Sequence, residues 1–418
     1  MKEVAITGLG VHSPIGLHPS AVVESLISLR SGIRRIDLEA TGKAYAVGLI
    51  EQDFSECFSK IERPLLDRIA QLAVLAAQQA SEDAGIANYS TFGERAGVFL
   101  GTARGGVTTE WAASQEFVHT PSKTARPYYL MGSMPNSAAS HISIRQRIFG
   151  PAITHTTACS SSGVAIADAC RHILCGELDI ALAGGSESTV QPAVAPIFLR
   201  LWDALRALAE VADEPGTSCR PFSADRTGVA LAEGAAFFVL ESVDHARQRG
   251  APILGYVSGF GVASDAFHLG APHPRGQTAA MRSALRKAGI EAADVDYVNA
   301  HATATREGDP VEITALKEVF GARAEQLPVS STKAQHGHML GAASAMEALV
   351  SLLAARHAFI PATAHLGEVD ADCLGVQHVR QPLQGRPIRY AMSLSAGFGG
   401  TNCALVLRPG NPTPSDRT

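Results

Sequence analysis

The stretch TTACSSSGVAIADAC, residues 156–170, places a cysteine between a β-like run and an apolar helical pattern. A strand that leads into a buried helix is typical of α/β folds. Cys159 is therefore expected at a helix N-terminus, where free backbone N–H groups and the helix dipole favour thiolate over thiol. The stretch predicts a nucleophilic cysteine, and the alternative is a small residue packed at a strand-to-helix turn.

On either side of this stretch, short β runs alternate with helical patterns, which indicates an α/β fold with helices covering the sheets. Glycine-rich strand ends recur in each half, as LAGGSES at 182–188 and SAGFGGTN at 395–402. We expect a weak internal duplication with its division near Gly250, giving halves 1–250 and 251–418. Strands are predicted within 3–10, 95–102, 179–185, 235–242, 297–303, 327–333, 389–395 and 402–408.

The composition of the 418 residues excludes several classes of function. A net charge of −5 without a basic patch argues against nucleic acid, and no apolar run is long enough to span a membrane. The seven cysteines form no CxxC pair, so neither a metal site nor a thioredoxin-like motif is predicted. TGLG at 7–10 is followed by Ser13 where a dinucleotide fingerprint has glycine. These features predict a cytoplasmic protein with free thiols.

Two histidines lie at predicted strand ends in the second half, and strand ends are where α/β folds build sites. His301 follows YVNA, and His338 lies between a strand and an apolar helix. Each could be structural, but together with Cys159 they predict an active-site cluster. His338, near a helix N-terminus, is expected to be neutral.

Two charged residues near the histidines have simpler interpretations. Lys333, five residues before His338, could be a solvated charge. Glu312 could complete a capping box in which Asp309 is the N-cap.

The glycines around Phe398 allow a sharp turn that aims a backbone N–H at a developing oxyanion. Together with the N–H of Cys159, this turn would form a two-donor oxyanion hole. The alternative is a tight turn around a core phenylalanine.

With these motifs in order, the chain resembles the elongating β-ketoacyl-acyl-carrier-protein synthases of fatty acid and polyketide pathways. The resemblance runs nearly end to end. It rests on VAITGLGVHSPIG (4–16), TTACSSSG (156–163), LAGGSES, RPFSADRTGVALAEGAA (220–236), ASDAFH (263–268), YVNAHATAT (297–305), SSTKAQHGHMLGAASAMEA (330–348) and GFGGTN (397–402).

The resemblance implies a thiolase fold of two similar α/β halves in five α-β-α-β-α layers, dimeric through the first half. The partner would be a second copy or a related chain-length-factor subunit. Substrates would be carried on the phosphopantetheine of acyl carrier protein, and no metal or redox cofactor would be needed.

The resemblance also implies a role for each motif residue. Cys159 would take the acyl chain, His301 and His338 would bind the malonyl thioester and drive its decarboxylation, and Lys333 would order the histidines with Glu312 as its partner. Phe398 and Gly399 would form the gate beside the oxyanion hole, while Thr303 and Thr305 would hold the pantetheine arm.

Four departures from the family pattern concern the acyl pocket rather than the chemistry. Ala302 replaces a glycine, Ala396 replaces a phenylalanine, and Arg104 occupies a position that is usually small or aliphatic. The segment 191–216 is a few residues longer than usual and carries Trp202. These departures favour a specialised polyketide or polyene pathway over housekeeping fatty acid elongation.

Two other functions remain as alternatives. A non-catalytic partner subunit usually lacks the cysteine, and a degradative thiolase usually has one histidine and a second cysteine. Because carrier proteins are acidic, we also expect basic residues to guide docking. The candidates are Lys60, Arg63, Arg68 and Lys123.

Overall fold

The computed structural model describes residues 3–122 and 124–410. Within these ranges, one eleven-stranded sheet runs through the molecule in the order β13-β11-β10-β15-β16-β9-β1-β8-β6-β4-β5. Its centre is the short antiparallel pairing of β1 with β9, in which Val4–Ile6 face Gly255–Val257. This pairing joins two matching five-stranded units, one from each half of the chain, and β13 adds the eleventh strand at the edge of the second unit.

The two units have the same topology. In the first, β4 pairs in parallel with β5 and β6, and β8 is antiparallel to both β6 and β1. In the second, β10 pairs in parallel with β11 and β15, and β16 is antiparallel to both β15 and β9. The predicted duplication is therefore confirmed. The bounds are β1 (Val4–His12), β4 (Ala96–Gly101), β5 (Ala152–His155), β6 (Ile180–Glu187), β8 (Gly234–Ser242), β9 (Gly255–Ser264), β10 (Tyr297–Asn299), β11 (Pro328–Ser330), β15 (Ala391–Ala396) and β16 (Thr401–Pro409).

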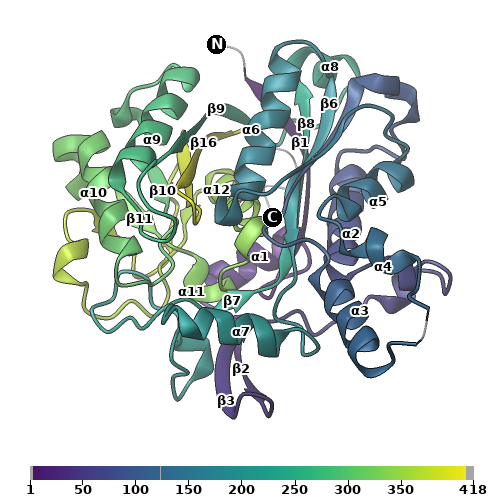
Figure 1. Cartoon of the computed structure of the whole chain (residues 1–418). Coiled ribbons are helices and arrows are strands. Elements are labelled where there is room, and N and C mark those ends of the chain that lie inside the picture. Colours follow the sequence, from purple (N-terminus) through teal and green to yellow (C-terminus); the bar gives the residue numbers. More distant parts are fainter. Residues whose placement is uncertain (1–2, 123, 411–418) are drawn as a thin grey trace.

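Helices cover both faces of each unit and give five layers (Figure 1). The outer layers are α2 with α5 on the first unit and α9 with α10 on the second. The inner layer is the pair α6 and α12, which contact each other between the units. The bounds are α2 (Arg68–Asp83), α5 (Ser137–Gln146), α6 (Ser161–Leu174), α9 (Pro274–Ala288), α10 (Gly308–Phe320) and α12 (Ala343–Arg356).

The TGLG motif of β1 serves helix packing. A Cβ on Gly10 would lie 1.9 Å from the backbone oxygen of Ala76 in α2, so only glycine allows this approach. Strand β9, which corresponds to β1 in the second unit, packs on its helix in the same way. A Cβ on Gly261 in β9 would lie 2.0 Å from the backbone oxygen of Ala280 in α9. The prediction that no dinucleotide fingerprint is present agrees with this packing role.

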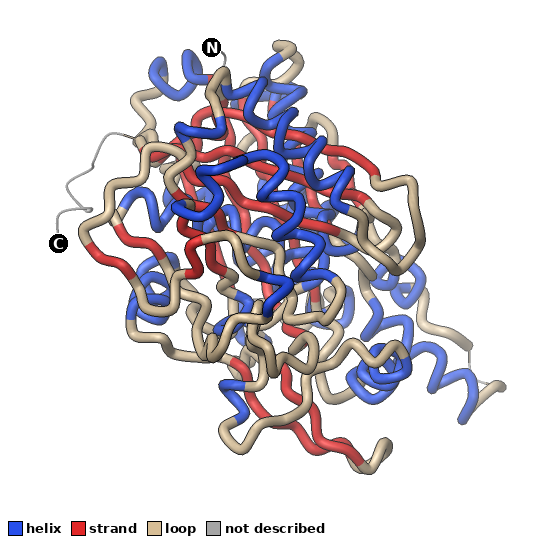
Figure 2. The backbone as a smooth tube through the Cα atoms, turned by 90° about the vertical axis from the view of Figure 1, so that its left-hand side faces the viewer, coloured by secondary structure: helices blue, strands red, loops and turns tan. Residues whose placement is uncertain are grey.

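The remaining elements surround this core. The hairpin β2–β3, paired with β7, projects at the lower end in Figures 1 and 2, and α7 lies beside it (Figure 1). Among the described residues, no helix is long and apolar enough to cross a membrane. The bounds are α1 (Pro19–Ile27), β2 (Ile33–Leu38), β3 (Lys43–Gly48), α3 (Val107–His119), α4 (Tyr128–Ser133), α7 (Ala195–Ala204), β7 (Leu231–Ala232), α8 (Val243–Gln248), α11 (Lys333–His336), β12 (Phe359–Ile360), β13 (Gln377–His378) and β14 (Leu383–Gln384).

Candidate active site

Cys159 lies in a single turn of 3₁₀ helix, Ala158–Ser160, between β5 and α6. Ala158 has a φ of 54°, a left-handed conformation that costs a non-glycine residue energy and is often found at functional sites. The turn is held from both sides. Ser161 donates to the carbonyl of Ala158 at 2.6 Å, and Ser344 of α12 donates to the carbonyl of Cys159 at 2.9 Å. The central helices thus fix the cysteine between the two units.

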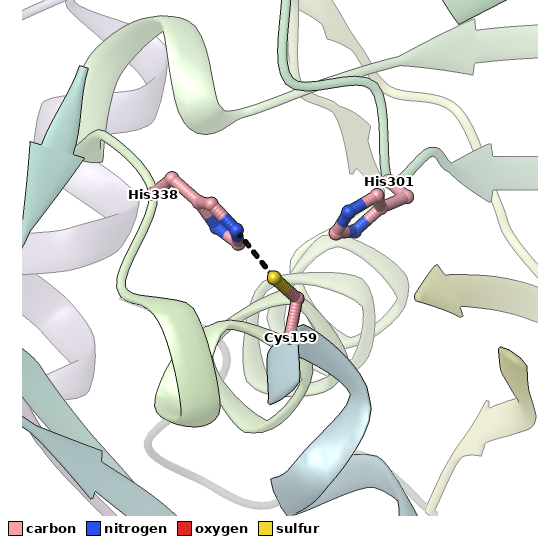
Figure 3. Close-up of side chains that lie close together, drawn as sticks. All are labelled: Cys159, His301 and His338. Atoms are coloured by element: carbon pink, nitrogen blue, oxygen red, sulfur yellow. Dashed lines mark hydrogen bonds between the residues drawn. The ribbon is translucent and has the colours of Figure 1, made fainter. Parts of the chain in front are cut away.

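His338 is the hydrogen-bonding partner of the thiol. Its Nε2 lies 3.0 Å from Sγ of Cys159, and Figure 3 shows His301 facing the sulfur from the other side. The sulfur and one ring nitrogen of each histidine lie within 4.8 Å of one another. The structure therefore brings together the three residues that the sequence analysis grouped.

Burial controls the protonation of this cluster. It raises the pKa of the Cys159 thiol to about 12, while Lys333 and the N–H of Phe398 act in the opposite direction. The prediction of a thiolate from the helix N-terminus alone is wrong, because Cys159 is only 6% exposed and burial disfavours the charged form. Burial, followed by the charge of Lys333, lowers the pKa of both His301 and His338 well below its usual value. The resting cluster is therefore a neutral thiol with two neutral imidazoles.

Lys333 is fully buried and forms an ion pair with Glu347 of α12. Its ammonium also lies 3.4 Å from Nδ1 of His301. An ammonium can only donate, so Nδ1 accepts and the proton of neutral His301 resides on Nε2. Lys333 thereby orients His301 as a hydrogen-bond donor toward the site.

The partner of Lys333 differs from the prediction, which named Glu312. The carboxylate of Glu312 accepts the backbone N–H groups of His301 at 2.7 Å and Ala302 at 2.8 Å. It therefore fixes the backbone of the His301 turn. The predicted capping box is also wrong, because α10 begins at Gly308 with Glu307 as its N-cap. Asp309 instead accepts the N–H of Phe222 at 2.8 Å.

The glycine loop after β15 carries the N–H of Phe398, which acts on the Cys159 thiol to lower its pKa against the effect of burial. Gly399 and Gly400 have φ values of 86° and 81°, which glycine adopts without strain. The N–H of Gly399 donates to the carbonyl of Leu269 at 2.7 Å. Gly399 therefore shapes the loop and is not an oxyanion donor.

The loop that carries Thr303 and Thr305 is half-buried, and the two hydroxyls lie 3.3 Å apart. Arg226, whose side chain is almost fully buried, donates to the carbonyls of Thr305 and Arg306 at 2.9 Å each. The role of Arg226 was not predicted from its motif. Glu347 was not predicted either, although a single acidic residue within an apolar helix is a sign of a buried ion pair.

An apolar cluster surrounds Cys159 and forms a candidate acyl-binding region. Trp202 lies at its edge and stacks on Phe398. Arg104 is exposed, with its guanidinium 5.0 Å from the centre of the Phe198 ring, so it has an aromatic partner. Ala396 borders a cavity of about 10 Å³, too small for an acyl chain. The buried apolar members of the cluster are Tyr45, Val47, Val190, Ala195, Leu199, Val229, Leu231 and Leu340.

The predicted docking residues differ in availability. Lys60 is exposed, and Arg63 is half-buried with an ion pair to Glu56 at 3.3 Å. Arg68 pairs with the buried carboxylate of Glu233, so the structure removes it as a docking candidate. Lys123 lies outside the described residues.

Comparisons with known proteins define the class. Residues 1–246 match the family model described as "Beta-ketoacyl synthase, N-terminal domain", and residues 254–367 match "Beta-ketoacyl synthase, C-terminal domain". The chain therefore belongs to the β-ketoacyl synthase family, and it is an enzyme of the acyltransferase class.

The chain is similar to Nodulation protein E of Rhizobium meliloti (strain 1021), with 40% identity over 97% of this chain and 99% of that protein. It is also 36% identical to 3-oxoacyl-[acyl-carrier-protein] synthase 2 of Coxiella burnetii, over 97% of this chain and 98% of the relative. The structure called "The ishigamide ketosynthase/chain length factor" matches with a TM-score of 0.89, 31% identity and coverage of 98% and 100% of the two chains. The predicted thiolase fold is confirmed.

Proposed function

We propose that this protein condenses an acyl thioester held on Cys159 with malonyl-acyl-carrier protein. The observation that carries the proposal is the cluster of one thiol and two imidazoles, whose sulfur and ring nitrogens lie within 4.8 Å of one another and whose thiol is hydrogen-bonded to His338. The two histidines, together with the cysteine, argue against a degradative thiolase. The intact cysteine argues against a non-catalytic partner subunit.

In the first step, the thiol of Cys159 attacks the carbonyl carbon of an acyl-phosphopantetheine thioester. The thiol proton passes to Nε2 of His338, which lies 3.0 Å away. The backbone N–H groups of Cys159 and Phe398 stabilise the oxyanion. The bond from carbon to the pantetheine sulfur then breaks, and that sulfur takes the proton from His338.

In the second step, malonyl thioester replaces the departing carrier. Nε2 of His301, protonated because Lys333 faces Nδ1, donates to the thioester oxygen. Cleavage of the bond to the carboxylate releases CO₂ and leaves an enolate, so decarboxylation needs donors rather than a strong base. The enolate carbon attacks the acyl carbonyl, and the Cys159 sulfur leaves and takes up one proton from water.

The test is incubation with acyl-carrier protein and then malonyl-carrier protein. Mass spectrometry should detect acyl-Cys159 and, after the second addition, a β-ketoacyl carrier product. Absence of both from folded protein would overturn the proposal.

The pathway is proposed to be specialised. Support comes from Trp202 at the edge of the acyl-binding cluster, from Arg104 against the ring of Phe198, and from the similarity to Nodulation protein E and to an ishigamide ketosynthase. Loading rates for saturated, oxygenated and polyene acyl donors test this point. Preference for saturated donors would favour the alternative of housekeeping elongation.

The proposed partners are acyl carrier protein and a second subunit, either another copy or a chain-length-factor relative. Strand β5 is at the end of the sheet and only partly buried, so its edge is available for pairing. Exposed apolar side chains on α4, Leu130 and Met131, support an interface in the first half. Light scattering of the purified protein, alone and coexpressed with candidate subunits, tests this assembly.

The proposal needs no metal or redox cofactor, because the carrier supplies the thioester and the loss of CO₂ supplies the nucleophile. We place the protein in the cytoplasm. The seven free cysteines fit a reducing compartment.

A further inference from the structure

The backbone and the ring of Phe398 face two different residues. Its backbone N–H lowers the pKa of the Cys159 thiol, while its ring stacks on Trp202 with a centroid distance of 5.4 Å and an interplanar angle of 28°. The ring is not enclosed, since Phe398 is 46% exposed. The indole of Trp202 is therefore a main contact that holds this ring in place, and stacked aromatic pairs are favourable beyond their buried area.

The two sides of the stack differ in how firmly they are anchored. Trp202 belongs to α7, whose Ala195 and Leu199 are buried in the apolar cluster that contains Cys159. Next to it, Asp203 forms a 2.6 Å ion pair with Lys43 of β3. Phe398, in contrast, precedes two glycines with positive φ, in a loop that joins two strands. If one ring of the pair moves, it is that of Phe398.

We propose that Trp202 is a positioning residue that holds the Phe398 ring against α7 in the resting enzyme, and that an acyl chain on Cys159 separates the two rings. This inference rests on the proposed function for its biological meaning. The chain enters the apolar cluster at whose edge Trp202 lies, and there it meets the pair of stacked rings. Trp202 thereby sets how readily long acyl donors load, compared with short ones.

The chain offers its own optical reporter, because it contains only two tryptophans, Trp111 and Trp202. In a Trp111→Phe background, emission comes from Trp202 alone. The exposed Cys57 and Cys175 are changed to serine so that alkylation is directed to Cys159. The probe is N-octyl iodoacetamide. It forms a thioether as iodide leaves, and the thiol proton passes to buffer.

We expect alkylation of Cys159, verified by mass spectrometry, to shift the emission maximum of Trp202 to longer wavelength. The Cys159→Ala variant treated in the same way should show no shift. The Phe398→Ala variant should show a similar shift before any alkylation, because its indole already lacks the stacked ring. Alkylated Cys159 with unchanged emission would overturn the proposal.

Rates of alkylation distinguish the proposed positioning role of Trp202 from a merely structural role. Trp202→Ala should increase the rate with the octyl probe several-fold relative to the rate with iodoacetamide itself. Trp202→Phe should keep most of the wild-type ratio, since a phenyl ring can still stack. Equal changes in the alkylation rates of both probes in Trp202→Ala would show that the residue only supports the fold. This result would contradict the proposed positioning role.

These measurements need no carrier protein, so they are independent of the condensation assay. If acyl-carrier protein fails to load Cys159 while the octyl probe shifts the emission of Trp202, the proposed function fails and the positioning role of Trp202 stands. If loading succeeds and the emission does not change, only the positioning role fails.

Discussion

The two halves of the chain build the same five-stranded unit but place different chemistry at corresponding strand ends. After β5, the first half turns into α6 and presents Cys159. After the corresponding strand β11, the second half turns toward α12 and presents Lys333 and then His338. The turn after β10 adds His301, whereas the turn after β4 leads to the exposed Arg104. The nucleophile therefore comes from one half, and the lysine and imidazole side chains come from the other.

This difference shows how a duplicated scaffold supports a two-step reaction. Because β1 and β9 are adjacent, the central helices α6 and α12 begin next to each other, and Ser344 of α12 bonds to the backbone of Cys159. Neither half contains a complete site. The predictions below test whether Cys159 and His301 act in separate steps, from the largest expected effect to the smallest.

Removing His301 should affect the second step much more than the first. We expect His301→Ala to reduce CO₂ release from malonyl-carrier protein by about 10²- to 10⁴-fold, as for other losses of a positioned proton-transfer or oxyanion-stabilising group. Acylation of Cys159 should change far less, because the hydrogen bond to the thiol comes from His338. Stopped assays with mass spectrometry measure both steps, and equal losses in both would break the proposed division.

The buried ion pair between Lys333 and Glu347 should matter for stability as well as for orientation. Glu347→Gln leaves a buried ammonium without its counter-ion and should destabilise the fold by about 3–5 kcal/mol.

The double variant Lys333→Met/Glu347→Leu is the matched control. It should recover most of the melting temperature while remaining deficient in decarboxylation. If Glu347→Gln melts like the wild type, the ion pair is not the main partner of Lys333.

The reactivity of Cys159 should rise steadily with pH. A pKa raised to about 12 means that the thiol is protonated at neutral pH, so each unit of pH increases the thiolate fraction about tenfold. With Cys57 and Cys175 changed to serine, iodoacetamide should label Cys159 faster at each step from pH 7 to pH 9. A plateau near pH 7 would instead indicate the thiolate that the helix N-terminus alone predicts.

The smallest expected effect concerns carrier docking. Charge reversal of Lys60 and Arg63 together should raise the KM for acyl-carrier protein several-fold, mostly at low salt, because exposed charges are screened. Reaction with small acyl thioesters should be unchanged. Lys317→Glu, an exposed lysine of α10, is the control, and an equal effect from it would show that only net charge matters.

The sequence predicted the positions of the strands well, because each motif follows a short apolar run, but β10 and β11 end at Asn299 and Ser330, before the predicted ranges end. The eight predicted strands correspond to β1, β4, β6, β8, β10, β11, β15 and β16. Strand β9 was not predicted, because Gly255, Gly259 and Gly261 lower its β propensity. The structure explains these glycines by close packing, for example of Gly261 on α9.

The sequence alone could not predict which charged residues pair with each other or which groups are buried. Glu347 lies 14 residues from Lys333 and on a different helix, so nothing in the local pattern favours it over Glu312. In the same way, the helix N-terminus at Cys159 was predictable, but the burial that raises its pKa depends on both halves. The direction of the Gly399 N–H depends on the distant Leu269.

The most direct test of the division between the halves is CO₂ release by the Cys159→Ala variant supplied with malonyl-carrier protein. Because the donors lie in the second half, Cys159→Ala should still release CO₂, and Cys159→Ala/His301→Ala should release it at least about 10²-fold more slowly. Loss of CO₂ release in folded Cys159→Ala, or an unchanged rate in the double variant, would contradict the account.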